Sequence, residues 1–182
     1  DADICIVPTA SQLEDTGERY QKLFTDLGAG NTHWLPISER SDAKKAEYVA
    51  QLEKCTGIFI TGGNQLRLST ILGGTAIAQA IRKLNAQGVH IAGTSAGAAI
   101  VSQHMITGGN TGIVPTEDGV NLAPGLGLIN TIVVDQHFNE RNRLSRLLSA
   151  VSYNPFLLGL GLDEDTAAFI DSNNVFTVVG SG

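Results

Sequence analysis

A serine in a glycine-rich turn is the residue of this sequence best suited to nucleophilic chemistry. Residues 93–97 read Gly-Thr-Ser-Ala-Gly and follow the apolar run at 89–92. This Gly-x-Ser-x-Gly pattern is typical of a nucleophile elbow, a sharp strand-to-helix turn that exposes the serine hydroxyl. Ser95 could instead be a simple helix cap, but its place between an apolar strand and a small-residue helix favours a nucleophile. The next amide, at Ala96, would then help to stabilise an oxyanion.

One of the four histidines is placed to act as the base that such a serine requires. A serine hydroxyl is a weak nucleophile until a neighbouring base removes its proton. His137 leaves the end of a predicted strand inside a polar run at 135–137, so it is the candidate base. The other three histidines have no acidic or nucleophilic neighbour in a motif and are interpreted as structural: His33, His90 and His104.

Three adjacent acids are candidates for the carboxylate that would orient this imidazole. They are Asp163, Glu164 and Asp165, and their spacing does not distinguish one from another. A solvated acidic turn is the alternative interpretation. If one of them serves, the chain order is serine, histidine, acid, whereas the α/β-hydrolases run serine, acid, histidine. The order therefore argues against the α/β-hydrolase fold but not against a catalytic triad.

Three of the seven arginines lie close together beside the candidate base: Arg141, Arg143 and Arg146. In a chain with a net charge of -6 they form a local cluster of positive charge. Because a guanidinium group binds a carboxylate through paired hydrogen bonds, this arginine cluster predicts an anionic substrate. The alternatives are a solvated helix face or pairing with Glu140 and Asp135.

Composition and charge restrict the class of protein. With 182 residues, 42% of them hydrophobic and 16% charged, the chain is long enough to bury a substantial core as a single domain. Its net negative charge argues against nucleic-acid binding, and no apolar run reaches the roughly 18–20 residues of a membrane span. Cys5 and Cys55 form no Cys-x-x-Cys or Cys/His metal pattern, so we expect two core thiols, no metal and no cofactor.

Short apolar runs alternate with helix-like segments along most of the chain. This alternation predicts an α/β fold with a mostly parallel sheet and helices on both faces. Active sites of such sheets collect at the carboxyl ends of the strands, where Ser95, His137 and the acids at 163–165 all fall. Residues 107–127, rich in Gly, Asn and Pro, are predicted to form a long surface loop. Strands are predicted at 4–7, 34–37, 57–61, 89–92, 128–134, 157–162, 169–170 and 175–179, and helices at 20–27, 42–54, 75–87 and 139–150.

Three segments of the sequence resemble the cyanophycinases of peptidase family S51. They are TGGNQLRL at 61–68, GTSAGA at 93–98 and DQHFNERNRLSRL at 135–147, of which the last is long and unusual. The similar order of strands and helices extends over essentially the whole chain. Because family members are longer at both ends, we expect residues 1–182 to be a single S51-like catalytic domain that lacks a piece at each terminus.

The resemblance implies a class I glutamine amidotransferase-like fold, of the flavodoxin-like three-layer type, with a serine in place of the cysteine nucleophile. It implies hydrolysis of cyanophycin, a poly-aspartate whose side-chain carboxyls carry arginine, to β-Asp-Arg dipeptides. By motif, Ser95 is the implied nucleophile, His137 the base and Glu164 the acid. The amides of Gly63 and Ala96 are the implied oxyanion hole. The implied substrate-binding residues are Gln65, Asp135, Gln136, Arg141, Arg143 and Arg146.

Two other functions remain open. A related S51 dipeptidase that cleaves Asp-X dipeptides would need the same carboxylate pocket, and a non-catalytic binding module would keep the same fold. A glutamine amidotransferase is disfavoured because neither Cys5 nor Cys55 lies in an elbow. The expected partners are cyanophycin or an aspartyl peptide and a second copy of the chain in a homodimer. No nucleic acid, membrane or cofactor is expected, and the expected location is the cytoplasm.

Overall fold

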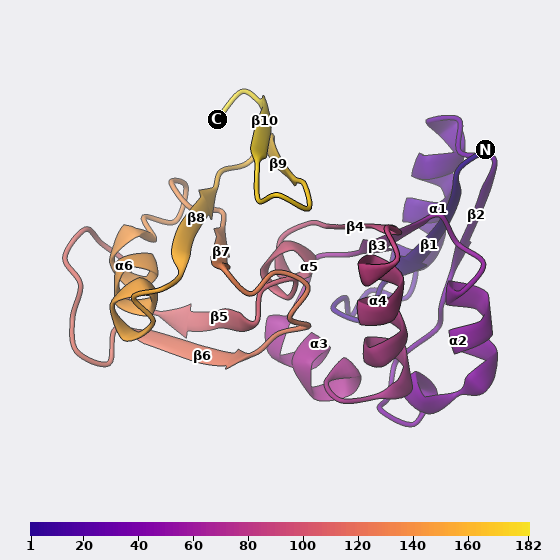
Figure 1. Ribbon diagram of the computed structural model, residues 1–182, viewed down its shortest axis with the longest axis horizontal. Coiled ribbons are helices and arrows are strands. Elements are labelled where there is room, and N and C mark those ends of the chain that lie inside the picture. Colours follow the sequence, from indigo (N-terminus) through magenta and orange to yellow (C-terminus); the bar gives the residue numbers. More distant parts are fainter.

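Four parallel strands form the central sheet of the computed structural model, which describes residues 1–182 (Figure 1). In the order β2-β1-β3-β4, β1 (Asp3–Val7) and β3 (Gly57–Ile60) are central, and β2 (Asn31–Trp34) and β4 (His90–Gly93) are at the edges. Every neighbouring pair is parallel. All four carboxyl ends therefore lie along one edge, where the polar segments that follow β3 and β4 begin.

One face of this sheet is covered by α1 (Thr16–Asp26). Tyr20 and Phe24 of this helix pack on Phe59 of β3, with ring centroids 5.2 Å and 5.1 Å apart. Because successive side chains of a strand point to opposite faces, the two neighbours of Phe59 in β3 face away from α1. An apolar aromatic contact thus decides which side of the sheet this helix occupies.

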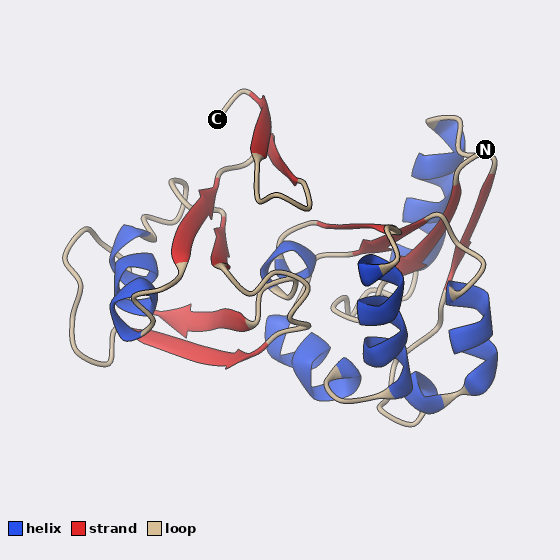
Figure 2. Cartoon of the chain, in the orientation of Figure 1, coloured by secondary structure: helices blue, strands red, loops and turns tan.

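The opposite face carries the main hydrophobic core. Ile58 and Ile60 are buried there together with residues of α2 (Ala46–Leu52) and α4 (Ala76–Ala86). Helices consequently cover both faces of the parallel sheet (Figure 2). The α/β class predicted from the sequence is confirmed.

The second half of the chain forms a smaller group of strands beside this sheet. β7 (Ile132–Gln136) and β8 (Leu158–Leu162) pair in parallel, and α6 (Leu144–Tyr153) packs against them. The short helix α5 (Ala96–Ala99) lies between the two halves (Figure 1), in contact with both β4 and β7. No helix is long and apolar enough to cross a membrane. The remaining strands form two antiparallel pairs: β5 (His104–Gly109) with β6 (Val120–Pro124), and β9 (Thr166–Ile170) with β10 (Phe176–Gly180).

Two parts of the chain have more regular structure than the sequence predicts. The predicted loop at 107–127 includes the end of β5 and all of β6, which pair across a register shift between Ile106 and Gly108. Helix α3 (Gln65–Leu72) has no predicted counterpart. It begins where the side chain of Asn64 accepts a hydrogen bond from a backbone amide and so caps the helix. The two glycines before Asn64 are typical of a loop, so the sequence pattern does not indicate a helix start there.

Two predicted helices are shorter than expected. The helix predicted at 42–54 is broken, because Lys45 adopts an extended conformation between a 3-10 turn and α2. The helix predicted at 139–150 begins only at Leu144, because the residues after β7 form turns. Those turns, rather than a helix, carry the side chains that follow His137.

Candidate active site

Ser95 occupies a strained turn between β4 and α5. Its backbone has a φ of 51° and a ψ of -113°, which L residues rarely adopt. Glycines make the turn possible: a Cβ at Gly93 would collide with the carbonyl of Gly97, and a Cβ at Gly97 would collide with the carbonyl of Ile60. The turn leaves a half-buried hydroxyl at the carboxyl end of β4, as a nucleophile elbow requires.

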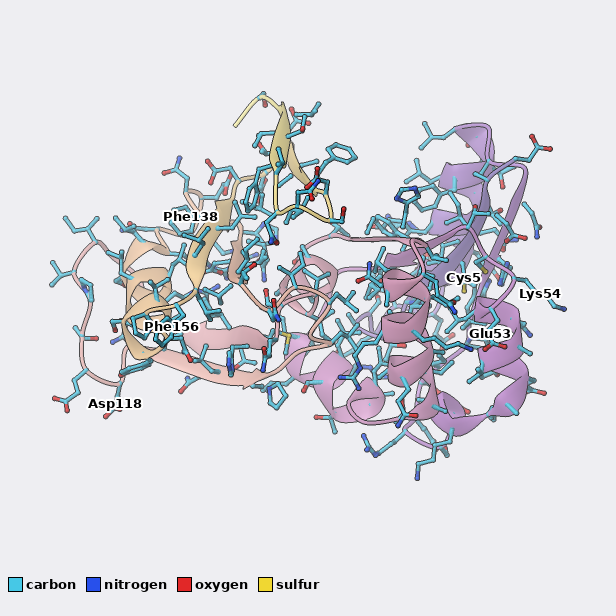
Figure 3. The ribbon with its side chains drawn as sticks, viewed as in Figure 1. Cys5, Glu53, Lys54, Asp118, Phe138 and Phe156 are labelled. Atoms are coloured by element: carbon cyan, nitrogen blue, oxygen red, sulfur yellow. The ribbon has the colours of Figure 1, made fainter.

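His137 follows β7 directly and has a left-handed backbone, with a φ of 48°. Its Nε2 lies 3.1 Å from Ser95 Oγ. The next residue holds the loop in place, because the ring of Phe138 packs on Gly161 of β8, where a Cβ would lie 2.6 Å from ring Cδ1. Phe138 can be followed beside β8 in Figure 3. The amide of Phe138 also donates a 3.1 Å hydrogen bond to the carbonyl of Leu162.

The three adjacent acids after β8 have three different partners. Glu164 Oε1 lies 3.0 Å from His137 Nδ1. Asp163 Oδ1 instead accepts a 2.8 Å hydrogen bond from the amide of Asn139. Asp165 accepts a 2.7 Å hydrogen bond from a serine hydroxyl beyond β10. Only Glu164 of the three contacts the imidazole, so Ser95, His137 and Glu164 form a continuous hydrogen-bonded chain.

Glu140 joins the loop of the histidine to the loop of the acid, a role the sequence does not reveal. Its Oε1 accepts a 2.8 Å hydrogen bond from the backbone amide of Glu164. This hydrogen bond is the main reason that the pKa of Glu140 lies below its ordinary value, and the charge of His137 contributes less. The sequence offers Glu140 as a possible arginine partner, but the structure contains no such pair. Its place in the polar segment of His137 is the only signal that could have identified it.

The two amides predicted to form an oxyanion hole belong to the turns after β3 and β4. Ala96 is the buried first residue of α5. Gly63 has a φ of 142°, and a Cβ there would collide with the carbonyl of Ala10, so only glycine fits. The N–H of Gly63 has no acceptor within the chain. The two turns are adjacent, since a Cβ at Gly62 would lie 3.1 Å from the Cβ of Ser95.

Arg146 is held inside the protein by an acidic partner. Its Nε donates a 2.6 Å hydrogen bond to Asp135 Oδ2, and its Nη2 donates to Asp135 Oδ1. Both side chains are buried, with Arg146 5% exposed and Asp135 1% exposed. The pair fastens α6 to the end of β7. This arrangement is the pairing with Asp135 that the sequence left open as an alternative to substrate binding.

The other two arginines of the cluster differ from one another. Arg143 is buried, and its Nη1 donates to Gln136 Oε1 at 2.8 Å and also to the Gln136 carbonyl. Burial, and after it the charge of Arg146, lowers the pKa of Arg143. Arg141 is exposed and makes no side-chain hydrogen bond or ion pair. Of the three guanidinium groups, that of Arg141 is therefore the most available to a ligand.

Gln65 lies at the start of α3, directly after the turn that contains Gly63. It is half-buried, and its Nε2 donates a 3.3 Å hydrogen bond to the carbonyl of Ile106 in β5. Gln65 thus connects the turn after β3 to the second half of the chain, which carries His137. The structure brings the predicted triad together but gives Asp135, Gln136, Arg143 and Arg146 partners inside the protein.

The chemistry available to this arrangement is acyl transfer. A histidine within hydrogen-bond reach of a serine removes the hydroxyl proton, and a carboxylate on the far ring nitrogen fixes the tautomer. A free backbone amide in the turn next to the hydroxyl is also the type of donor that stabilises the negative charge of a tetrahedral intermediate.

Comparison with known sequences gives one family. The model of peptidase family S51 matches residues 1–178. A cyanophycinase of Geminocystis herdmanii is 45% identical over 185 residues, covering 100% of this chain and 68% of that protein. Cyanophycinases of a Nostoc species and of Synechococcus elongatus are 44% and 43% identical, and this chain spans 61% and 57% of their lengths. The chain thus spans little more than half of the length of these two relatives.

Solved structures agree with the sequence comparisons. The crystal structure of a peptidase from an acI-B1 actinobacterium has a TM-score of 0.73 and is 28% identical, covering 98% of this chain and 74% of that one. A putative peptidase E protein from Listeria monocytogenes has a TM-score of 0.67 and is 24% identical, covering 100% of this chain and 87% of that one. At this lower identity the second comparison establishes similarity of fold alone.

Proposed function

The chain belongs to peptidase family S51, and on that premise we propose that it is a serine exopeptidase that hydrolyses cyanophycin to β-Asp-Arg dipeptides. The observation that carries the proposal is the hydrogen-bonded chain from Ser95 through His137 to Glu164. The choice of substrate is supported by the curated relatives, each of which is named a cyanophycinase.

In the proposed reaction, His137 Nε2 removes the proton from Ser95 as Oγ attacks the scissile carbonyl carbon. The charge that develops on the carbonyl oxygen is stabilised by the amides of Gly63 and Ala96. His137 then returns the proton to the leaving amine, and the peptide C–N bond breaks to leave an acyl-enzyme on Ser95. A water molecule, deprotonated by His137, attacks the ester carbonyl carbon. The bond from that carbon to Ser95 Oγ breaks, His137 returns the proton to Oγ, and the acid product leaves. Glu164 keeps the proton of the imidazole on Nδ1 and stabilises its cation.

Substrate recognition is proposed to depend on the arginine cluster in two different ways. Arg141 is exposed and unpaired, so it is the residue proposed to bind a free carboxylate of the substrate. Arg146 and Arg143 are proposed to act through Asp135 and Gln136, holding the end of β7 and thereby the position of the base. Gln65 is proposed to line the same site, because it starts the helix that follows the Gly63 turn.

The first experiment incubates the chain with purified cyanophycin and identifies the products by mass spectrometry. Release of β-Asp-Arg, absent with the Ser95→Ala variant, is the expected result. A parallel reaction with Asp-X dipeptides separates the proposal from the alternative of a dipeptidase. Hydrolysis of the dipeptides with no attack on the polymer would favour that alternative. Binding of the polymer without hydrolysis of either substrate would favour a non-catalytic module.

Two expectations of the sequence stay proposals, a homodimer and a cytoplasmic location. The dimer is supported by exposed apolar side chains in the second half of the chain, where Leu158, Phe169 and Val178 are 63%, 63% and 60% exposed. Sedimentation at micromolar concentration tests it directly, and a monomer mass would remove it.

A further inference from the structure

Three side chains with metal-ligating atoms converge on the face of the sheet opposite α1. Cys5 lies in β1 and is directly paired with His33 of β2, while Cys55 precedes β3. The two sulfurs and a ring nitrogen of the histidine all lie within 4.8 Å of one another. Both cysteines are free and buried. No active-site residue belongs to this group, which we call the Cys5–His33–Cys55 cluster.

One distance in this cluster matches the separation of two ligand atoms around a tetrahedral metal ion. Zinc binds thiolate sulfur at about 2.3 Å and imidazole nitrogen at about 2.0–2.1 Å, so a tetrahedral ion separates these two ligand atoms by about 3.6 Å. Cys55 Sγ and His33 Nε2 are 3.7 Å apart. This pair therefore needs little rearrangement to bind a tetrahedral ion, and Cys5 Sγ lies within 4.8 Å of the other ligand atoms.

A carboxylate behind the histidine supplies an independent observation. Asp3 Oδ1 lies 3.7 Å from His33 Nδ1, on the side of the ring away from the cysteines. This oxygen is buried and has no hydrogen-bond partner. Histidines that bind metals through one nitrogen usually donate the other N–H to a carboxylate, which fixes the tautomer. The 3.7 Å separation is longer than a hydrogen bond, but a small rotation of either side chain would let His33 Nδ1 donate to this unpaired oxygen and present Nε2 to an ion.

We propose that Cys5, His33 and Cys55 bind one zinc-class divalent cation. Two thiolates with one imidazole are a ligand set that zinc uses widely. Of the three ligands, His33 also lines a surface recess, together with Asp3, Asn31, Gln51 and Lys54, so a water molecule acting as fourth ligand would approach from that side. Figure 3 shows Cys5 in the interior and Lys54 on the outside of the same region.

The role of such an ion is structural. It joins β1, β2 and the segment between α2 and β3, which otherwise meet through apolar packing and the strand ladders. The catalytic groups instead follow the carboxyl ends of β4 and β7. The sequence does not reveal the cluster, because its members at positions 5, 33 and 55 are 28 and 22 residues apart and no short metal motif is present.

Cobalt titration of the reduced, tag-free protein tests the proposal. Co²⁺ is the probe because thiolate ligation gives a charge-transfer band in the near ultraviolet and tetrahedral geometry gives strong visible bands. We expect one equivalent to bind and one equivalent of Zn²⁺ to displace it. Cys55→Ser and His33→Gln should each abolish the bands, whereas His90→Gln, which removes a histidine outside the cluster, should leave them unchanged.

A second measurement keeps the proposal testable if a cysteine variant folds poorly. Zn²⁺ at about one hundred times its dissociation constant should raise the thermal midpoint of the unsubstituted protein by about 5–10 °C, and this shift should vanish in His33→Gln. The proposal is overturned if the reduced protein binds cobalt without a thiolate band, or if the bands survive in Cys55→Ser. It is also overturned if the zinc-induced shift is unchanged in His33→Gln.

Discussion

Replacement of Asp135 by asparagine separates a structural role of the arginine cluster from a role in binding substrate. Asp135→Asn keeps the size of the side chain and removes its charge. In the folded protein, Arg146 would then keep one acceptor oxygen at most and would lose its counter-charge while remaining buried. Arg143 Nη1 also lies 3.7 Å from Asp135 Oδ1. The variant would therefore leave two buried guanidinium groups without the negative charge that lies between them.

The size of the effect follows from the burial of both partners. Removing one member of a buried ion pair costs about 3–5 kcal/mol, because the remaining charge stays desolvated and unpaired. For a protein of this length each kcal/mol lowers the thermal midpoint by about 2–4 °C. Asp135→Asn should therefore lower the midpoint by about 6–20 °C. Replacement of both partners by apolar residues, Asp135→Leu with Arg146→Met, should recover part of that loss.

Thermal and urea unfolding followed by circular dichroism measure this effect, with Arg141→Lys as the matched control. Arg141 is exposed and unpaired, so its replacement should change the free energy of unfolding by no more than about 0.5 kcal/mol. The reasoning is refuted if Asp135→Asn unfolds within about 1 kcal/mol of the unsubstituted protein while its KM for substrate rises strongly. That result would assign Asp135 to the substrate instead of to Arg146.

Three further predictions concern the acids and the exposed arginine. Glu164→Gln should lower kcat by a factor of about 10⁴, the loss seen when a triad carboxylate is neutralised. Asp163→Asn and Asp165→Asn should lower kcat far less, and kcat values in the opposite order would contradict the geometry. Arg141→Lys should raise KM about tenfold to a hundredfold. Amidation of the substrate carboxylate should raise KM of the unsubstituted enzyme by a similar factor, and the two effects should not add. Equal KM values of the unsubstituted enzyme for free and amidated substrate would exclude the contact. Asp42 accepts a hydrogen bond from a neighbouring ammonium and others from backbone amides, which lower its pKa from 3.8 to about 2. The stability that this carboxylate contributes is complete above pH 3.8 and is lost as the pH falls through about 2. The difference in thermal midpoint between Asp42→Asn and the unsubstituted protein should therefore disappear over that interval. A difference that stayed constant would disprove the assignment.

The sequence was sufficient to place Ser95 and His137, the proposed nucleophile and base, because each directly follows a predicted strand. An apolar run that ends in Gly-Thr-Ser-Ala-Gly specifies both a strand and the turn after it. His137 follows another apolar run in the same way. The inference assumed that the two strands share one sheet edge, whereas β4 and β7 belong to different sheets. The short helix α5, which contacts both strands, brings the two residues together instead.

The acid and the arginines needed the fold. Which of Asp163, Glu164 and Asp165 faces the imidazole depends on the direction of the backbone, and that direction depends on distant contacts such as the hydrogen bond from the Asn139 amide to Asp163. Likewise, charge counting finds the arginine cluster but cannot tell that Arg146 points inward to Asp135 on another element. Burial decides between the two interpretations, and burial depends on how α6 packs against β7.

Covalent labelling of the serine tests the central claim most directly. A fluorophosphonate reacts with a serine whose hydroxyl is activated by a neighbouring base, so the intact mass of the protein reports the reaction. We predict a single adduct mapped to Ser95, no adduct in Ser95→Ala, and a loss of cyanophycin hydrolysis on the order of 10⁶ in that variant. An adduct on another residue, or Ser95→Ala activity within tenfold of the unsubstituted enzyme, would contradict the account.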